Sequence, residues 1–172
     1  MSINEKISEI LPDSSKPHKY FCDICKITCE YRTRHCRKCN VCVERYDHHC
    51  FWIGNCVGRH NHRQFYLFLA AQTINNIAVF LLISRSTISS NWQWLFQLTV
   101  KLLSLGFCCF TGYLLLYHTM LVSCGITTWE HMRRMKISYL KYLPPGFNPF
   151  SKGIVQNWRL FFTEQTRASG SN

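Results

Sequence analysis

The sequence predicts a mainly α-helical membrane protein: a cytosolic cysteine-rich segment with short β-hairpins, a two-helix transmembrane hairpin, and a short cytosolic C-terminal segment. Three observations predict this class. Charged residues make up 17% of the 172 residues, below the roughly 25% of an average soluble domain. Residues 1–65 hold 11 of the 20 Lys and Arg residues, whereas residues 102–132 hold none. Eight of the 11 cysteines lie between Cys22 and Cys56.

The chain is expected to have six parts. Residues 1–18 read as a linker with a short helical stretch at Ile3–Leu11 and no apolar run long enough to span a membrane. The parts that follow are the cysteine-rich segment 19–64, a transmembrane helix 65–84, a lumenal loop 85–101, a second transmembrane helix 102–125, and the C-terminal segment 126–172. No internal repeat is evident.

Two uncharged runs carry the transmembrane prediction. The first covers 19 residues from Phe65 to Ile83 and the second 24 residues from Leu102 to Gly125, close to the roughly 20 residues that a spanning helix needs. Three amides interrupt the first run, at Gln72, Asn75 and Asn76. Because unpaired amides are costly in lipid, they should face another helix or a polar cavity.

The flanking charges predict the orientation of the hairpin. Eighteen basic residues lie on its two terminal sides and two lie in or beside the connecting loop, so both termini are expected in the cytosol. Trp92 and Trp94 are typical of a loop at the membrane interface. The alternative, a buried core of a soluble helical protein, is disfavoured by the length of both uncharged runs.

The cysteine cluster predicts metal binding. Paired C-x2-C steps place two thiolates on one tight turn, where both can bind the same tetrahedral zinc, and so short a segment needs a metal to fold. Two zinc ions need eight ligands. The chain supplies that number with Cys22, Cys25, His35, Cys36, Cys39, Cys42, Cys56 and one of the adjacent histidines His48 and His49.

Cys50 is a surplus thiol with a histidine pair and Asp47 within four residues. This combination is typical of a thiolate nucleophile with a base and a carboxylate that orients the base. Spacing does not decide which histidine binds the metal. If the chain is extended here, side chains alternate, so His48 shares a face with Cys50 and His49 faces the zinc.

These residues resemble the DHHC-type protein S-acyltransferases, or palmitoyltransferases. The Cys/His spacing, Trp52, Asn55-Cys56, Gly58, Asn61 and Phe65 match the family pattern, Thr127-Thr128-Trp129-Glu130 resembles its TTxE motif, and Asn148-Pro149-Phe150 with Gly153 to Asn157 resembles its NP-aromatic element. The resemblance implies transfer of a palmitoyl group from acyl-CoA to protein cysteines near the cytosolic membrane face. It implies Cys50 as the acylated nucleophile, His48 as the base and Asp47 as its orienting group.

The resemblance also implies how the zinc ligands are divided. One zinc would be held by Cys22, Cys25, His35 and Cys42, and the other by Cys36, Cys39, His49 and Cys56. Thr128 would steady Asp47, and Asn157 would tie the C-terminal segment to the spanning helices. Arg59 and Arg63 could meet the phosphates of coenzyme A, although a positive-inside surface explains them equally well.

Several departures from the family pattern leave an alternative open. Family members usually carry two further helices before the cysteine-rich segment, so this chain reads as a short form. Phe51 stands where proline is usual, and Cys29-Glu30-Tyr31 where a basic residue and proline are usual. The alternative is a weakly active or inactive zinc-stabilised membrane scaffold. A nucleic-acid-binding module is not expected, because the basic residues follow the positive-inside rule. The stretch KYLPPGFNPF resembles small members of the Golgi and endoplasmic reticulum.

Overall fold

The computed structural model describes residues 20–85 and 91–168, with only the backbone for Asn91 and residues 164–168. The expected linker 1–18, with its stretch Ile3–Leu11, lies outside the described residues. The chain divides into two compact units, residues 1–63 with 121–172 and residues 64–120. The predicted class is confirmed: the chain is mostly helical, with short antiparallel hairpins in the cysteine-rich part.

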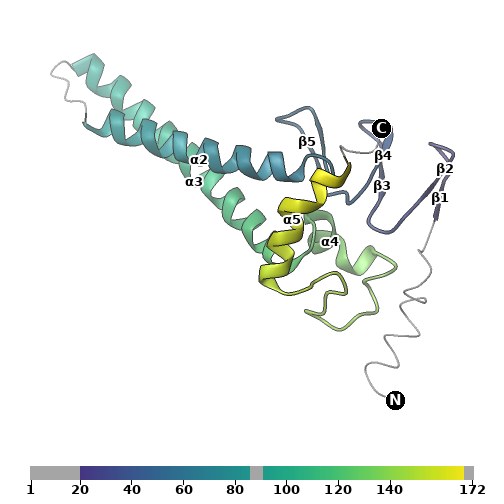
Figure 1. The fold of residues 1–172 in the computed structure, drawn as a ribbon. Helices are drawn as coiled ribbons and strands as arrows, with labels where there is room; N and C mark the ends of the chain where they lie inside the picture. Colours follow the sequence, from purple (N-terminus) through teal and green to yellow (C-terminus); the bar gives the residue numbers. More distant parts are fainter. Residues whose placement is uncertain (1–19, 86–90, 169–172) are drawn as a thin grey trace. The chain divides into compact units, whose positions relative to one another are not determined.

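Three two-stranded hairpins build the cysteine-rich part of the first unit (Figure 1). They pair β1 (Tyr20–Cys22) with β2 (Ile27–Cys29), β3 (Arg34–Cys36) with β4 (Val41–Val43), and β5 (His48–Cys50) with β6 (Asn55–Val57). The first strands begin at positions 20, 34 and 48, and the second strands at 27, 41 and 55, so the hairpin recurs every 14 residues. The expectation of no internal repeat is therefore wrong. The repeat is hard to see in the sequence because only a few positions, mainly metal donors, recur.

The turns of the hairpins share one backbone geometry. Lys26, Asn40 and Gly54 occupy the same place in the three turns and have φ of 55°, 54° and 60°. A left-handed residue here lets the chain reverse within four residues after each strand. Each turn thus brings the residue that ends the first strand close to the residue three positions later.

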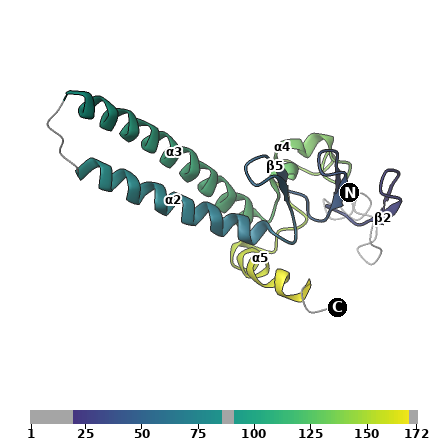
Figure 2. The ribbon, with the colours of Figure 1, turned by 90° about the horizontal axis from the view of Figure 1, so that it is seen from above.

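Two long helices follow the hairpins. Helix α2 runs over His62–Arg85 and helix α3 over Asn91–Cys124, and both are long and apolar enough to cross a membrane. Residues 91–101 of the expected loop are helical, because neither Gly nor Pro interrupts them and a single Lys101 does not end a helix. Figure 1 and Figure 2 both show α2 and α3 side by side.

Polar side chains link the two helices within residues 64–120. Gln72 Nε2 donates to Asn76 Oδ1 at 3.2 Å, and Asn76 Nδ2 donates to Thr111 Oγ1 of α3 at 3.2 Å. Tyr66 and Thr119 share a hydrogen bond of 3.0 Å. Two of the three predicted amides therefore bond inside the hairpin as expected, whereas Asn75 is exposed.

The C-terminal segment completes the first unit. It contains α4 (Thr128–Arg133), the 3₁₀ turn η1 (Arg134–Lys136) and α5 (Ile154–Ala168). A small apolar core lies between α4 and α5 in the sequence, formed by Ile137, Leu140 and Leu143 with Trp129, Tyr139 and Phe150 packed against it. This core holds α4 at the position where it meets the third hairpin.

Candidate active site and metal centres

The first group of metal donors joins two hairpins. Cys22 and Cys25 come from the β1–β2 turn, and His35 and Cys42 are directly opposite each other on β3 and β4. Their donor atoms lie within 4.8 Å of one another, with His35 Nδ1 at 3.8, 3.2 and 3.9 Å from the sulfurs of Cys22, Cys25 and Cys42. Donors around a tetrahedral zinc lie about 3.5–3.8 Å apart, so this group fits that ion.

The second group repeats this construction one hairpin later. Cys36 and Cys39 come from the β3–β4 turn, and His49 and Cys56 are opposite each other on β5 and β6. His49 Nδ1 lies 3.7, 3.3 and 3.6 Å from the sulfurs of Cys36, Cys39 and Cys56. Each group offers three thiols and one imidazole, the donor set typical of structural zinc. The eight donors thus fall into the two groups that the family resemblance implies.

Gly58 allows close contact between the second and third hairpins. A Cβ atom at this position would lie 2.5 Å from Val43 Cγ1 and 2.8 Å from the carbonyl oxygen of Glu44. Asn61 fixes the same backbone, since its Oδ1 accepts from Gly58 N and its Nδ2 donates to Cys56 O. Packing here therefore sets the distance between the hairpins that share the second group.

Cys50 occupies the strand-end position that Cys22 and Cys36 occupy in the earlier hairpins. The residue three positions later is Ile53 rather than a second cysteine, so this turn lacks the C-x2-C pair. Cys50 is 6% exposed and belongs to neither metal-donor group. It is thus a buried thiol held by the same kind of turn as Cys22 and Cys36 but outside both donor groups.

A carboxylate and an imidazole lie next to this thiol. Asp47 Oδ2 lies 2.7 Å from His48 Nδ1, and the Asp47 side chain is fully buried. Strand alternation puts His48 and Cys50 on one face of β5 and His49 on the other. Burial opposes the charged form of His48, but its hydrogen bond to Asp47, the charge of Asp47 and the nearby Cys50 thiol together raise the pKa of His48.

The expected contact between Thr128 and Asp47 is present, but it uses the backbone. The Thr128 N–H donates to Asp47 Oδ1 at 2.8 Å, and the Trp129 N–H donates to the carbonyl of Asp47 at 3.1 Å. The Thr128 hydroxyl is buried and makes no hydrogen bond. The first N–H of α4 therefore binds the carboxylate of Asp47 and the second binds its backbone carbonyl. Unpaired N–H groups at a helix N-terminus generally favour such acceptors.

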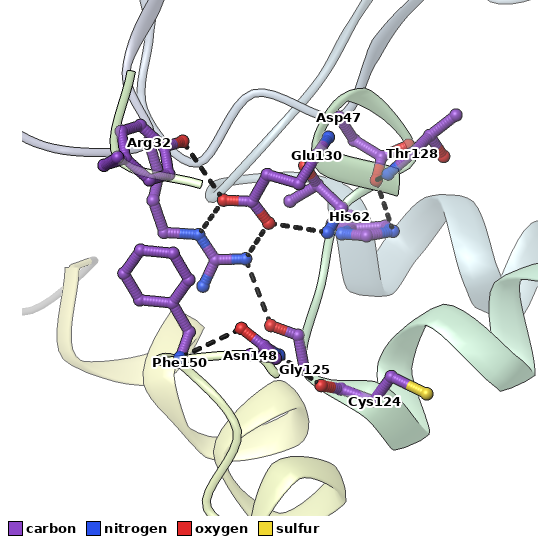
Figure 3. A network of polar contacts seen from close by, with 11 residues as sticks. Arg32, Asp47, His62, Cys124, Gly125, Thr128, Glu130, Asn148 and Phe150 are labelled. Atoms are coloured by element: carbon purple, nitrogen blue, oxygen red, sulfur yellow. Dashed lines mark hydrogen bonds and ion pairs between the residues drawn. The ribbon is translucent and has the colours of Figure 1, made fainter. Parts of the chain in front are cut away.

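Sequence reasoning missed His62. It is 4% exposed, its Nε2 lies 3.7 Å from Asp47 Oδ1, and its ring packs edge-on against Phe161 of α5 at 5.2 Å. Figure 3 shows it beside Asp47 and Thr128. No spacing rule marks this histidine, because it reaches the carboxylate only through tertiary packing.

A second missed feature is a partly buried ion pair between Arg32, which is 14% exposed, and the buried Glu130 (Figure 3). Arg32 donates from Nε at 2.7 Å and from Nη2 at 2.6 Å to the two oxygens of Glu130, and its guanidinium lies 4.4 Å from the Phe150 ring centroid. Glu130 also accepts from Thr127 N, and Thr127 Oγ1 accepts from Glu130 N, which makes a capping box at the start of α4. The ion pair joins two segments: the loop between β2 and β3, which carries Arg32, and α4, whose Thr128 N–H binds Asp47.

The remaining predicted residues lie as follows. Asn157 Nδ2 donates to the carbonyl of Ser123 near the end of α3, and Asn157 Oδ1 accepts from Lys152 N. The side chain of Asn157 packs against Gly125, whose φ is +69° and where a Cβ would lie 3.1 Å from it. Arg59 bonds Glu44, and Arg63 bonds the carbonyl of Phe162.

Comparison with known proteins agrees with this geometry. The family model for the DHHC palmitoyltransferases matches residues 15–135, which is most of the chain. The palmitoyltransferase ZDHHC12-A of Danio rerio is 46% identical to the chain over 44 residues. That alignment covers 26% of this chain and 16% of the relative.

Proposed function

Because the chain belongs to the DHHC palmitoyltransferase family, we propose that it is a protein S-acyltransferase that transfers a palmitoyl group from acyl-CoA to protein cysteines through a thioester on Cys50. The observation that carries this proposal is the 2.7 Å contact between Asp47 and His48, with Cys50 on the same strand face as His48. A carboxylate, an imidazole and a thiol in this order form the arrangement of a base-activated nucleophile.

In the first step, His48 takes the proton of the Cys50 thiol. Since Nδ1 of His48 donates to Asp47, Nε2 carries the lone pair that accepts this proton. The thiolate attacks the acyl carbonyl, the new S–C bond forms, and the bond to the coenzyme A sulfur breaks. The departing sulfur leaves with the proton from His48, so the base returns to its neutral form.

In the second step, a cysteine thiol of the substrate protein gives its proton to His48 and attacks the thioester. The acyl group moves to the substrate sulfur, and Cys50 leaves as a thiolate that recovers the proton. One base and one nucleophile therefore serve two thioester exchanges, and the expected kinetics are ping-pong.

Two zinc ions would be held by the two donor groups described above. Their role would be structural, because three thiols and one imidazole in each group supply all four ligands that a structural zinc takes. They would supply much of the folding free energy of three hairpins whose strands have only three residues each.

Acyl-CoA would bring an anionic head group to a basic surface. A cavity of about 370 Å³ in the first unit is lined by Arg32, Arg45, Arg59 and Lys152, together with Glu30 and Glu44. Arg59 is thus better placed than Arg63, which does not line it, to meet coenzyme A phosphates. The acyl chain would lie in the lipid bilayer or among the spanning helices.

We propose further that α2 and α3 cross a Golgi or endoplasmic reticulum membrane with both chain termini in the cytosol. The orientation is supported by the two basic residues near the connection against eighteen on the terminal sides. The organelle is supported by the likeness of the stretch KYLPPGFNPF to small members of the family in those membranes. Cys50 lies twelve residues before His62, the first residue of α2. Substrate proteins would then present cytosolic cysteines close to the membrane.

Self-acylation tests the proposal. The detergent-purified full chain is incubated with labelled palmitoyl-CoA and compared with Cys50→Ser and His48→Ala. Cys124→Ser is the matched control, because Cys124 is an exposed cysteine outside both metal groups. Zinc content and thermal unfolding are measured on every variant.

Hydroxylamine-sensitive label is expected on the wild type and on Cys124→Ser. It should be lost in Cys50→Ser and strongly slowed in His48→Ala. A folded wild-type chain with two zinc ions and no label would refute the enzymatic proposal and leave the membrane scaffold.

A further inference from the structure

Asn75 is a polar side chain in the middle of α2 (His62–Arg85), a helix that we propose to cross the membrane. The neighbouring amides Gln72 and Asn76 form hydrogen bonds inside the helical hairpin. The Asn75 side chain is exposed, and in the part of the chain that the structure describes its amide makes no hydrogen bond. At the centre of a bilayer this amide would face lipid tails, which offer neither a donor nor an acceptor.

Asn75 belongs to a row of exposed residues that recurs with heptad spacing along α2. The steps between successive members alternate between four and three residues, and the row consists of Gln64, Phe68, Ala71, Asn75, Ala78 and Leu82. A repeat of about 3.5 residues keeps one face of a helix against a partner helix in a left-handed coiled pair. Tyr66 and Asn76, which bond α3, lie outside this row. The row is therefore left uncovered when the hairpin forms.

Small side chains flank Asn75 in this row. Ala71 lies one helical turn before Asn75 and Ala78 one turn after it, and both are exposed. The exposed residues beside the row are large and apolar, with Ile74 at 68% and Ile77 at 43% exposure. Small residues let two helix backbones approach closely enough for side-chain amides to bond across the interface. The centre of the row thus has the composition of a helix–helix contact rather than of a lipid-facing surface.

The chemistry of the amide indicates a second copy of this chain as the partner. An amide carries both donors and an acceptor, so two Asn75 side chains can satisfy each other. Two copies inserted in the same orientation place this residue at the same depth in the bilayer. A different helix would need a polar side chain of its own at that depth. A single Asn at a core position of a heptad repeat also fixes the register and the number of helices.

We infer that the chain forms a parallel, two-fold symmetric dimer in the membrane through the row of α2 that contains Asn75. The interface is formed by the same residues of both copies, so each substitution changes both of its sides. This inference rests on the proposed membrane crossing of α2 and is independent of the proposed acyl transfer.

The test measures the dimer fraction of the detergent-purified full chain by native mass spectrometry over a range of protein concentrations. Asn75→Leu removes the amide and should lower the association constant by about 3- to 30-fold. Asn75→Gln keeps an amide in the row and should retain most of the association. The matched control is the exchange of Asn75→Ile with Ile77→Asn, which keeps the composition and moves the amide about 160° around the helix. It should associate as weakly as Asn75→Leu.

Two further variants test the packing and the position of the interface. Ala78→Leu fills the row beside Asn75 and should weaken association although the amide is still present. A photo-cross-linking amino acid that replaces Leu82, within the row, should yield a covalent dimer when the chain is reconstituted into liposomes. The same amino acid in place of Ile77, which is exposed outside the row, should yield little.

Four results would overturn the inference. They are a wild-type chain that stays monomeric in liposomes, a dimer that neither Asn75→Leu nor Ala78→Leu weakens, an exchange variant that associates like the wild type, and cross-linking from position 77 as strong as from position 82. Release of the wild-type chain from membranes by alkaline carbonate would instead refute the membrane crossing itself. Self-acylation does not enter any of these measurements, so failure of the proposed enzymatic activity would leave the test of the dimer intact.

Discussion

The contact between Thr128 and Asp47 can be removed with a single substitution, Thr128→Pro. Thr128 is the first residue of α4, a position that accepts proline because its N–H makes no intrahelical bond. Thr127 has φ −98° and ψ 162°, in the extended region that a residue before proline prefers. The substitution should therefore keep the helix and delete only the N–H that reaches Asp47.

The expected effect follows from the hydrogen bond that is lost. A hydrogen bond to a charged group contributes about 1.5–3 kcal/mol, and the proline ring also occupies the place of the amide hydrogen, so the carboxylate must withdraw. If the lost hydrogen bond stabilises the transition state for Cys50 acylation by this amount, the acylation rate of Thr128→Pro should fall by about 10- to 100-fold. Thr128→Val should leave the rate nearly unchanged, because the hydroxyl makes no hydrogen bond.

The assay is the rate of hydroxylamine-sensitive labelling of the detergent-purified chain by labelled palmitoyl-CoA. Zinc content and thermal unfolding establish that Thr128→Pro remains folded. A folded Thr128→Pro variant with the wild-type rate would refute the role of the N–H. An equal loss of rate in Thr128→Val would show that the hydroxyl carries the contact instead.

Three further predictions concern stability and pH. Arg32→Met should destabilise the first unit by about 3 kcal/mol, because it leaves the buried Glu130 carboxylate without its cationic partner. In thermal unfolding, the double variant with Glu130→Gln should recover part of the lost stability. Strictly additive losses of stability in the double variant would contradict the pairing. Gly58→Ala should cost about 1–3 kcal/mol through overpacking against the second hairpin, and an unchanged unfolding temperature would disprove the close contact. Because Asp47 raises the pKa of His48, the neutral base forms only as pH rises through that raised value. On the acid side of the pH profile, the acylation rate should therefore reach half of its maximum at a pH above about 6.5, the ordinary pKa of histidine. This midpoint should move to lower pH in Asp47→Asn. A midpoint that does not move would argue against the coupling of Asp47 to His48.

The 14-residue hairpin repeat also accounts for the position of Cys50, the proposed nucleophile. Cys22, Cys36 and Cys50 end the first strand of successive hairpins, and only the last lacks a second cysteine three residues later. No hairpin follows to supply an opposed histidine and cysteine, since α2 begins at His62. The third turn therefore holds a thiol in the geometry of a metal donor with no metal group to join.

Local spacing was enough to predict much of this protein from its sequence. The C-x2-C steps and the adjacent histidines indicated metal donors, the triplet Asp47, His48 and Cys50 indicated a nucleophile with its base, and two uncharged runs indicated the long helices. These features lie within a few residues of one another or depend only on composition. For the same reason the sequence separated His48 from His49 once the strand was assumed to be extended.

Tertiary structure alone decided the remaining contacts. Arg32 meets Glu130 across 98 positions in the chain, and the Thr128 N–H meets Asp47 across 81. His62 reaches the same carboxylate only because the packing of α5 and the third hairpin places it there. The partner of each buried charge depends on how distant segments of the chain pack together. The pattern of residue types along the sequence does not give the distance in space between such segments.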